Sequence, residues 1–192
     1  MREEAEQAAA EVLAAVPRWL WNGETPPVPV EEIADSCFGL HVREVEDLAG
    51  APGAPSLSDG QTLSGLLLAG PREIWVNAGE AVAWPPRRRF TIGHELGHWV
   101  LHRERAAAAG GVFCRHASVE AEAVRPALPP EEQEANAFAA ELLMPAAMVR
   151  RCYEVLKARG EDPFAVLCHL FGSSQAAMGR RLHRAVPRGV GG

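Results

Sequence analysis

Apolar residues recur at helical spacing along most of the chain, while a stretch near the middle alternates as strands do. Helices are predicted over residues 2–21, in VPVEEIADSCFGL up to Gly39, over about 85–105, and over 131–144, 146–159, 163–171 and 174–185. Strands are predicted in HVREVED, LSGLLLAG and REIWVNAG, and the last two form a hairpin around Gly70 and Pro71.

Residues 106–130 separate two of these helices and show little periodicity, with Gly110 and Gly111 inside and Pro129 and Pro130 at the end. We interpret them as a long loop or as a flap with a short helix, because loops of this length in compact domains are usually functional or disordered. Residues 187–192 are expected to be a disordered tail.

This element order predicts an α+β fold with a small antiparallel or mixed sheet packed on the helix near residue 95. We expect a first domain over residues 1–149 and a helical segment over 150–186 that packs on it. The segment DPFAVLCHLFGSSQAAMGRRLHRA has the shape of a helix-turn-helix, with Arg180, Arg181 and Arg184 in its second helix. We favour packing on the first domain over direct DNA binding for this pair.

The distribution of charge and the pattern of cysteines help to predict in which cellular compartment the protein lies. The net charge is −6, with eight Arg or Lys against three Asp or Glu from Arg150 onward, so the first 149 residues are acidic. The first residues, MREEAEQAAAEV, contain no apolar core of a secretory signal, and the longest apolar run is too short to span a membrane. The four cysteines form no CxxC pair. We expect a cytoplasmic protein with reduced thiols and no membrane partner.

The stretch RRFTIGHELGHWVLHR holds the clearest chemistry. On a helix, His94 and His98 lie one turn apart on one face, so their ring nitrogens can bind one zinc ion. Glu95 is offset by about 100° on the helix and can act as the general base on a water molecule, as in HExxH peptidases. His102 lies about 12 Å from His94 along a straight helix axis, so we assign it to the surroundings of the site and not to the ligands.

A catalytic zinc site needs a third protein ligand. In PPEEQEANAFAAELLMP, small residues on one helical stripe would let that helix pack closely on the zinc helix, with Glu132 and Asn136 facing the site. We predict Glu132 as the third ligand and Asn136 as a hydrogen-bond partner of a ligand histidine. Glu134 and Glu131 are the alternatives, although these two and Glu141 are expected to face solvent.

Both segments together resemble the ImmA/IrrE family of metallopeptidases, whose signature includes ExxAN-FA-LLMP. Weaker matches are VPVEEIA, LSGLL, IWVN and FGSSQAAMGRRL, so the resemblance spans about residues 5–185. It implies a zincin-like domain in which His94, His98 and Glu132 bind the metal and Glu95 is the base. It also implies an endopeptidase that cuts a helix-turn-helix repressor and so switches on phage, mobile-element or stress genes.

Several alternatives stay open. The metal can be zinc or manganese. Tyr153, the only tyrosine, can contact the substrate or the developing oxyanion, but a core position is the more common role. Cys114, near His116, can supply a thiolate that closes the metal site. The competing function is a DNA-binding or protein-binding regulator whose metal is structural, and Glu95 argues against it because a structural site needs no base.

Overall fold

The computed structural model describes residues 2–51, 54, 61–108, 112–118 and 128–186, and within these residues four strands form one sheet. The strands are β1 (His41–Val45), β2 (Gln61–Leu68), β3 (Glu73–Asn77) and β4 (Val112–Ser118). Their order is β1-β3-β2-β4, with β1 parallel to β3 and β2 antiparallel to both of its neighbours. The sheet is therefore mixed, and the predicted hairpin of β2 and β3 is confirmed.

Both faces of this sheet are covered. Leu67 of β2 and Ile74 of β3 belong to the main core, whereas Leu66 and Leu68 point the other way into a second apolar cluster with Leu48. Successive strand residues point to opposite faces, so the unbroken apolar run in LLL buries side chains on each side. This explains why β2 does not alternate between apolar and polar residues.

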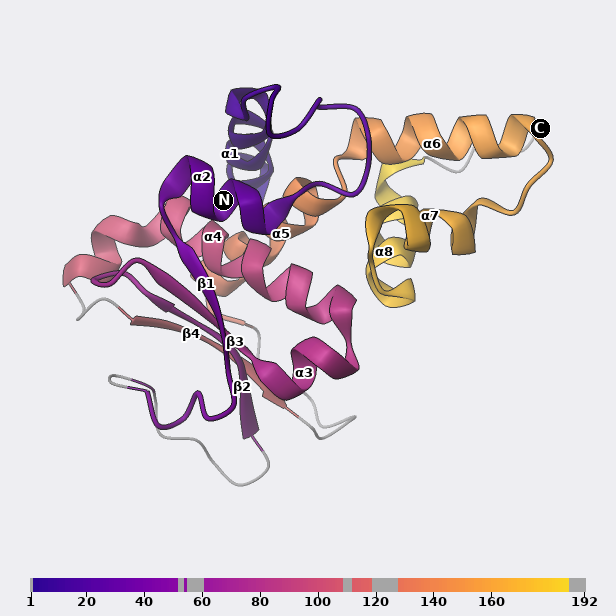
Figure 1. Cartoon of the computed structure of the whole chain (residues 1–192). Helices are drawn as coiled ribbons and strands as arrows, with labels where there is room; N and C mark the ends of the chain where they lie inside the picture. The colour runs from indigo at the N-terminus through magenta and orange to yellow at the C-terminus, as the bar shows by residue number, and fades with distance from the viewer. Residues whose placement is uncertain (1, 52–53, 55–60, 109–111, 119–127, 187–192) are drawn as a thin grey trace.

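Up to Leu143, the described residues also form five helices: α1 (Arg2–Ala15), α2 (Val30–Phe38), α3 (Ala78–Ala83), α4 (Pro85–Ala108) and α5 (Pro130–Leu143). Helix α4 lies between the sheet and the other helices, packing on β2 and β3 with one side and on α5 with another (Figure 1). Helix α1 packs in turn on α5. The longest helix is thus held on several sides, which fixes the direction of its side chains.

The last three described helices form a lobe beside the sheet and the first five helices, which together are the body of the fold (Figure 1). They are α6 (Ala146–Ala158), α7 (Pro163–Phe171) and α8 (Gln175–Ala185). The turn between α7 and α8 contains Gly172 in the left-handed conformation, and the Ser174 side chain caps α8 by accepting a hydrogen bond from the Ala177 backbone. The helix-turn-helix outline expected from the sequence is therefore present as a pair of packed helices.

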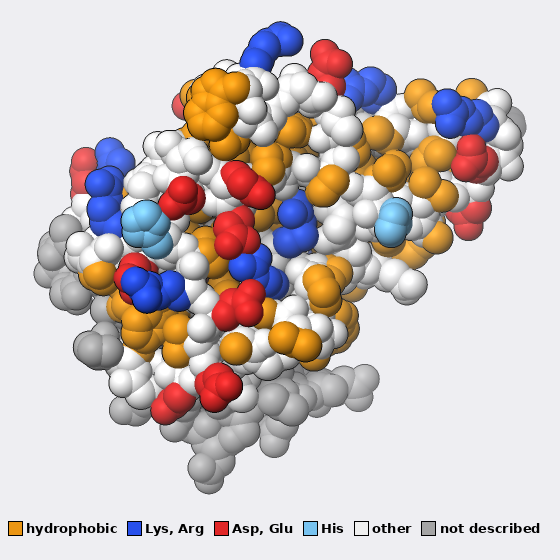
Figure 2. All heavy atoms as spheres, viewed as in Figure 1, with side chains coloured by type: hydrophobic (Ala, Val, Ile, Leu, Met, Phe, Trp, Pro, Cys, Tyr) orange, Lys and Arg blue, Asp and Glu red, His pale blue; other side chains and the backbone are white. Residues whose placement is uncertain are grey.

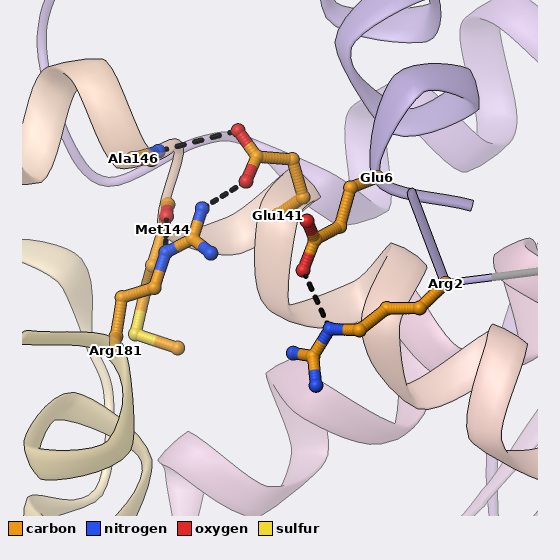
Figure 3. A network of polar contacts seen from close by, with 6 residues as sticks. All are labelled: Arg2, Glu6, Glu141, Met144, Ala146 and Arg181. Carbon is orange, nitrogen blue, oxygen red and sulfur yellow. Dashed lines mark hydrogen bonds and ion pairs between the residues drawn. The ribbon is translucent and has the colours of Figure 1, made fainter. Parts of the chain in front are cut away.

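The buried Arg181 connects this lobe to the body through hydrogen bonds and an ion pair (Figure 3). Arg181 of α8 donates from Nε to the Met144 carbonyl oxygen at 2.6 Å and pairs through its second nitrogen with Glu141 of α5. The other Glu141 oxygen accepts from the Ala146 backbone at the start of α6. One ion pair therefore joins α8 to the point where α5 ends and α6 begins. Arg181 is only 5 % exposed, so it does not offer its charge to a nucleic acid.

Several element boundaries differ from the sequence predictions. The first helix ends at Ala15 rather than at residue 21, because the following Val16 precedes Pro17 and such a residue disfavours helical backbone. Part of the region read as a loop or flap forms strand β4, which pairs with β2. Helix α3 was not predicted, although Asn77 caps it by accepting from the Glu80 backbone.

The other predicted helices and strands are confirmed, as is the α+β class. The predicted division at residue 149 falls inside α6 and stays a prediction. The predicted tail, 187–192, lies outside the described residues. In the part of the chain that the structure describes, no helix has the length and apolar character needed to cross a membrane.

Candidate metal centre

Helix α4 carries its histidines on the side that faces α5, and the two helices approach each other closely. Small residues permit this: a Cβ added at Gly97 would lie 3.2 Å from the Ala135 carbonyl oxygen and 3.1 Å from a ring carbon of Phe138. One turn earlier, a Cβ at Gly93 would lie 3.5 Å from the Ala139 Cβ. Side chains from α5 can therefore reach the buried face of α4, as the stripe of small residues in the sequence predicts.

Three side chains converge at this helix contact. The Nε2 atoms of His94 and His98 are 3.1 Å apart, and both rings are completely buried. Glu132, from the first turn of α5, places one carboxylate oxygen 3.2 Å from His94 Nε2 and the other 3.1 Å from His98 Nε2. The structure thus brings together the three residues that the sequence analysis selected as metal ligands.

These distances fit a metal ion. Bonds of about 2.0–2.1 Å to a tetrahedral zinc ion place neighbouring ligand atoms about 3.3–3.4 Å apart, close to the spacings measured between the three side chains. Two ring nitrogens and a carboxylate this close together need positive charge between them, supplied by protons or by a cation. The donor set, two imidazoles and one carboxylate, is one that zinc peptidases use.

The electrostatics of Glu132 favour its ionised form. Burial alone would raise the pKa of this carboxyl, but the hydrogen bonds and charges of His94 and His98 outweigh it and hold the pKa well below its usual range. The carboxylate is therefore charged at neutral pH, which a metal ligand has to be.

Glu95 lies on another side of α4, against strand β2. Its side chain is completely buried, and a Cβ added at Gly65 would lie 3.0 Å from Glu95 Oε1. The carboxylate thus occupies the space left by a glycine in the strand. It follows His94 directly in the sequence and is not one of the three converging residues.

A second pair of side chains extends the site along α4. His102 is 2 % exposed, its Nδ1 lies 3.2 Å from His98 Nδ1, and its Nε2 lies 2.9 Å from a carboxylate oxygen of Glu134. The expectation that Glu134 and Glu141 face solvent is wrong, because Glu134 contacts His102 and Glu141 pairs with the buried Arg181. Sequence reasoning placed His102 near the site and missed its partner, which is 32 residues away.

The remaining candidates are less closely tied to the centre. Asn136 is partly buried on α5. Tyr153 lies on α6, partly buried against the core, and α6 packs mainly on α7 and α8. Their roles stay predictions. Cys114 and His116 belong to β4, where side chains lie outside the described part, so the thiolate hypothesis does too.

A cavity of about 210 Å³ opens at the start of α4, against α8. Its lining includes Trp84, Arg87, Phe90, Met144 and Arg180. None of the three converging residues lines it. The cavity is therefore separate from the candidate metal centre.

An α+β fold in which two histidines and a glutamate converge beside a buried carboxylate is the arrangement of a metallopeptidase. The profile of the Peptidase_M78 family, described as the IrrE N-terminal-like domain, matches residues 52–183. The chain belongs to this family, which is a family of metallopeptidases. The resemblance expected from the sequence is thereby confirmed.

The chain can also be compared with curated proteins and with solved structures. The search of curated proteins gave no significant match. Among solved structures, the chain is similar to a "Mycobacterium tuberculosis transcriptional regulator", with a TM-score of 0.52 and 17 % sequence identity. The match covers 98 % of this chain and 48 % of that one, so this chain spans about half the length of the regulator. At this identity, the likeness supports the fold.

Proposed function

We propose that this protein is a zinc-dependent endopeptidase that hydrolyses a peptide bond in a helix-turn-helix transcriptional repressor. The observation that carries the proposal is the convergence of His94, His98 and Glu132 within bonding reach of one ion, with Glu95 buried beside them. Manganese is the alternative metal, since imidazole and carboxylate groups bind both.

In this proposal, each side chain has a separate task. His94, His98 and Glu132 would hold the metal, and a zinc ion bound there would polarise the substrate carbonyl and lower the pKa of water toward neutrality. Glu95 takes a proton from the attacking water while the oxygen of that water bonds to the carbonyl carbon. The same carboxyl then gives that proton to the leaving nitrogen as the C–N bond breaks. Glu95 is completely buried, which keeps bulk water away from this proton.

An extended substrate segment can bind along β4. This strand is at the edge of the sheet, with β2 on one side, and it packs against α4. Edge strands offer unpaired backbone groups to an added strand, which gives affinity without demanding a particular sequence. An endopeptidase that acts on a protein loop needs such a site, because the chain must be held extended at the cleavage point.

The choice of a repressor as substrate rests on the family resemblance. A role in transcription also agrees with the structural neighbour, which is itself described as a transcriptional regulator. Cleavage of a repressor would derepress phage, mobile-element or stress genes, and it requires both proteins to be in the cytoplasm.

The competing proposal is a regulator that binds DNA or protein through α7 and α8 without cutting. Arg180 and Arg184 are exposed on α8 and favour it, whereas the buried Arg181 does not. On the face shown in Figure 2, acidic and basic side chains are interspersed. In the described part of the chain, some arginines are also neutralised by ion pairs, such as that of Arg88 with Glu31. That face therefore offers no continuous basic surface of the kind that phosphates attract.

The test is incubation of the protein with helix-turn-helix repressors from the same genome, with any cleavage detected by mass spectrometry. We expect the zinc-loaded wild type to produce two fragments and Glu95→Gln, equally loaded with zinc, to produce none. Glu104→Gln, which removes an exposed charge from the same helix, is the control and should cleave normally. Normal cleavage by Glu95→Gln would refute the mechanism, and DNA binding with steep salt dependence in the absence of cleavage would favour the regulator.

A further inference from the structure

A chain of three buried or partly buried side chains leads away from the candidate metal centre. His98 points Nε2 at Glu132 and at His94, and its other nitrogen, Nδ1, lies 3.2 Å from His102 Nδ1. His102 in turn directs Nε2 at Glu134, 2.9 Å away. His98, His102 and Glu134 are 0 %, 2 % and 21 % exposed, so bulk water does not replace these contacts easily.

The hydrogen positions in this chain follow from donor and acceptor counting. A neutral imidazole has one N–H donor and one acceptor nitrogen, and a nitrogen that binds a metal must be the acceptor. If His98 binds through Nε2, its Nδ1 carries the hydrogen and donates it to His102 Nδ1. His102 must then carry its own hydrogen on Nε2, where it donates to the Glu134 carboxylate. The opposite tautomer of His102 would set two N–H groups against each other and leave the carboxylate facing an acceptor.

We propose that His102 and Glu134 act together as a positioning pair for His98. The pair fixes the tautomer and ring orientation of His98, and the negative charge of Glu134, relayed through His102, makes His98 a stronger ligand. Metal-binding histidines commonly donate their second N–H to a carboxylate directly. In this chain a second imidazole is inserted between the two. The inference rests on the proposed function, because it takes His98 as a metal ligand.

This pairing also gives a reason for the spacing of the residues. His94, His98 and His102 follow one another at four-residue intervals on one side of α4. Along α5, Glu132 reaches the first two histidines and Glu134 reaches the third. The two carboxylates therefore have different tasks, ligation by Glu132 and orientation by Glu134.

The first experiment measures zinc affinity by competition with a coloured chelator, starting from metal-free protein. We expect His102→Phe, which keeps an aromatic ring but removes both hydrogen bonds, to bind zinc about 10- to 100-fold more weakly than the wild type. Glu134→Gln keeps an acceptor but loses the charge, and we expect a loss of about 10-fold, at the lower end of that range. Glu104→Gln removes an exposed charge from α4 and should bind as the wild type does.

A second readout does not depend on any variant folding correctly. Nitrogen-15 NMR of the zinc-loaded wild type shows which ring nitrogen of each histidine carries the hydrogen, and we expect Nδ1 for His98 and Nε2 for His102. A purely structural role for the pair would not require this pattern. A hydrogen on His102 Nδ1 would overturn the proposal, and so would wild-type zinc affinity in both His102→Phe and Glu134→Gln. Neither result would contradict the proposed peptidase function. If the wild type itself binds no zinc, the proposed function fails and the pairing fails with it.

Discussion

Gly65 of β2 lies directly opposite Glu95 of α4, so close that a single added methyl group would touch its carboxylate. A Cβ at this position would lie 3.0 Å from Glu95 Oε1 and 2.3 Å from Cγ2 of the buried Thr91. The strand and the helix can approach this closely only because residue 65 has no side chain. The position of the proposed base is therefore set partly by a residue of the sheet.

Gly65→Ala should reduce both stability and activity. The new methyl group forces Thr91 to move, at a cost of about 1–3 kcal/mol in the free energy of unfolding. A displaced Glu95 should lower kcat/KM about 100-fold. Chemical denaturation and peptide cleavage measure the two effects. Gly70→Ala is the matched control, since nothing lies within 4 Å of its Cβ.

A double variant separates the two effects of that methyl group. Thr91→Ser removes Cγ2, so Gly65→Ala combined with Thr91→Ser should regain most of the lost stability. Activity should stay low, because the contact with Glu95 remains. Full recovery of activity together with stability would show that Gly65 serves only the packing of Thr91.

Gly97→Ala should push α5 away from α4. Its Cβ would meet the backbone of Ala135 at 3.2 Å, and a backbone cannot turn aside as a flexible side chain can. We expect a loss of about 1–3 kcal/mol in unfolding free energy and weaker zinc binding, because α5 carries Glu132. Gly179→Ala in α8 is the control: its nearest neighbour would be 3.9 Å away, so the better helix propensity of alanine should stabilise the protein by up to about 1 kcal/mol. Thermal unfolding of both variants measures these opposite changes in stability.

Arg181→Met should destabilise the chain by about 3 kcal/mol, because it leaves the partly buried Glu141 without its cationic partner. The Met144 carbonyl also loses its donor. Replacing both partners, Arg181→Met with Glu141→Leu, should recover much of the loss, since no unpaired charge remains. Urea denaturation measures the difference, and Arg180→Met, on the exposed side of the same helix, should change stability by no more than about 0.5 kcal/mol. Equal effects of Arg181→Met and Arg180→Met would mean that the buried pair contributes nothing.

The sequence was sufficient to predict features that depend on local spacing. The helix that carries His94 and His98, the stripe of small residues around Ala135, and the αL ending of α2 at Gly39 all follow from patterns within a few residues. The structure places Glu132 with His94 and His98, and the stripe allows that placement to be predicted because it shows which side of α5 faces α4. Helix α3 was missed although the Asn77 cap gives a local signal.

Features that depend on distant contacts could not be predicted in the same way. Strand β4 exists because it pairs with β2, and its own sequence, VFCRHAS, shows no clear strand pattern. Glu134 and Glu141 look like ordinary solvated residues of a helix until the fold brings His102 and Arg181 to them. The strand order β1-β3-β2-β4, too, depends on pairings far apart in the chain.

Zinc binding to the ligand variants tests the central claim most directly. Metal-free wild type, His94→Ala, Glu132→Ala and Glu95→Gln would each be titrated with zinc, with Glu131→Ala as the control from the same turn as Glu132. We predict about one zinc ion per chain for the wild type, Glu95→Gln and Glu131→Ala, because His94, His98 and Glu132 are the described residues that converge as ligands. His94→Ala and Glu132→Ala should lose this tight binding. A wild type that takes up no zinc, or a Glu132→Ala variant that binds it as tightly as the wild type, would contradict the account.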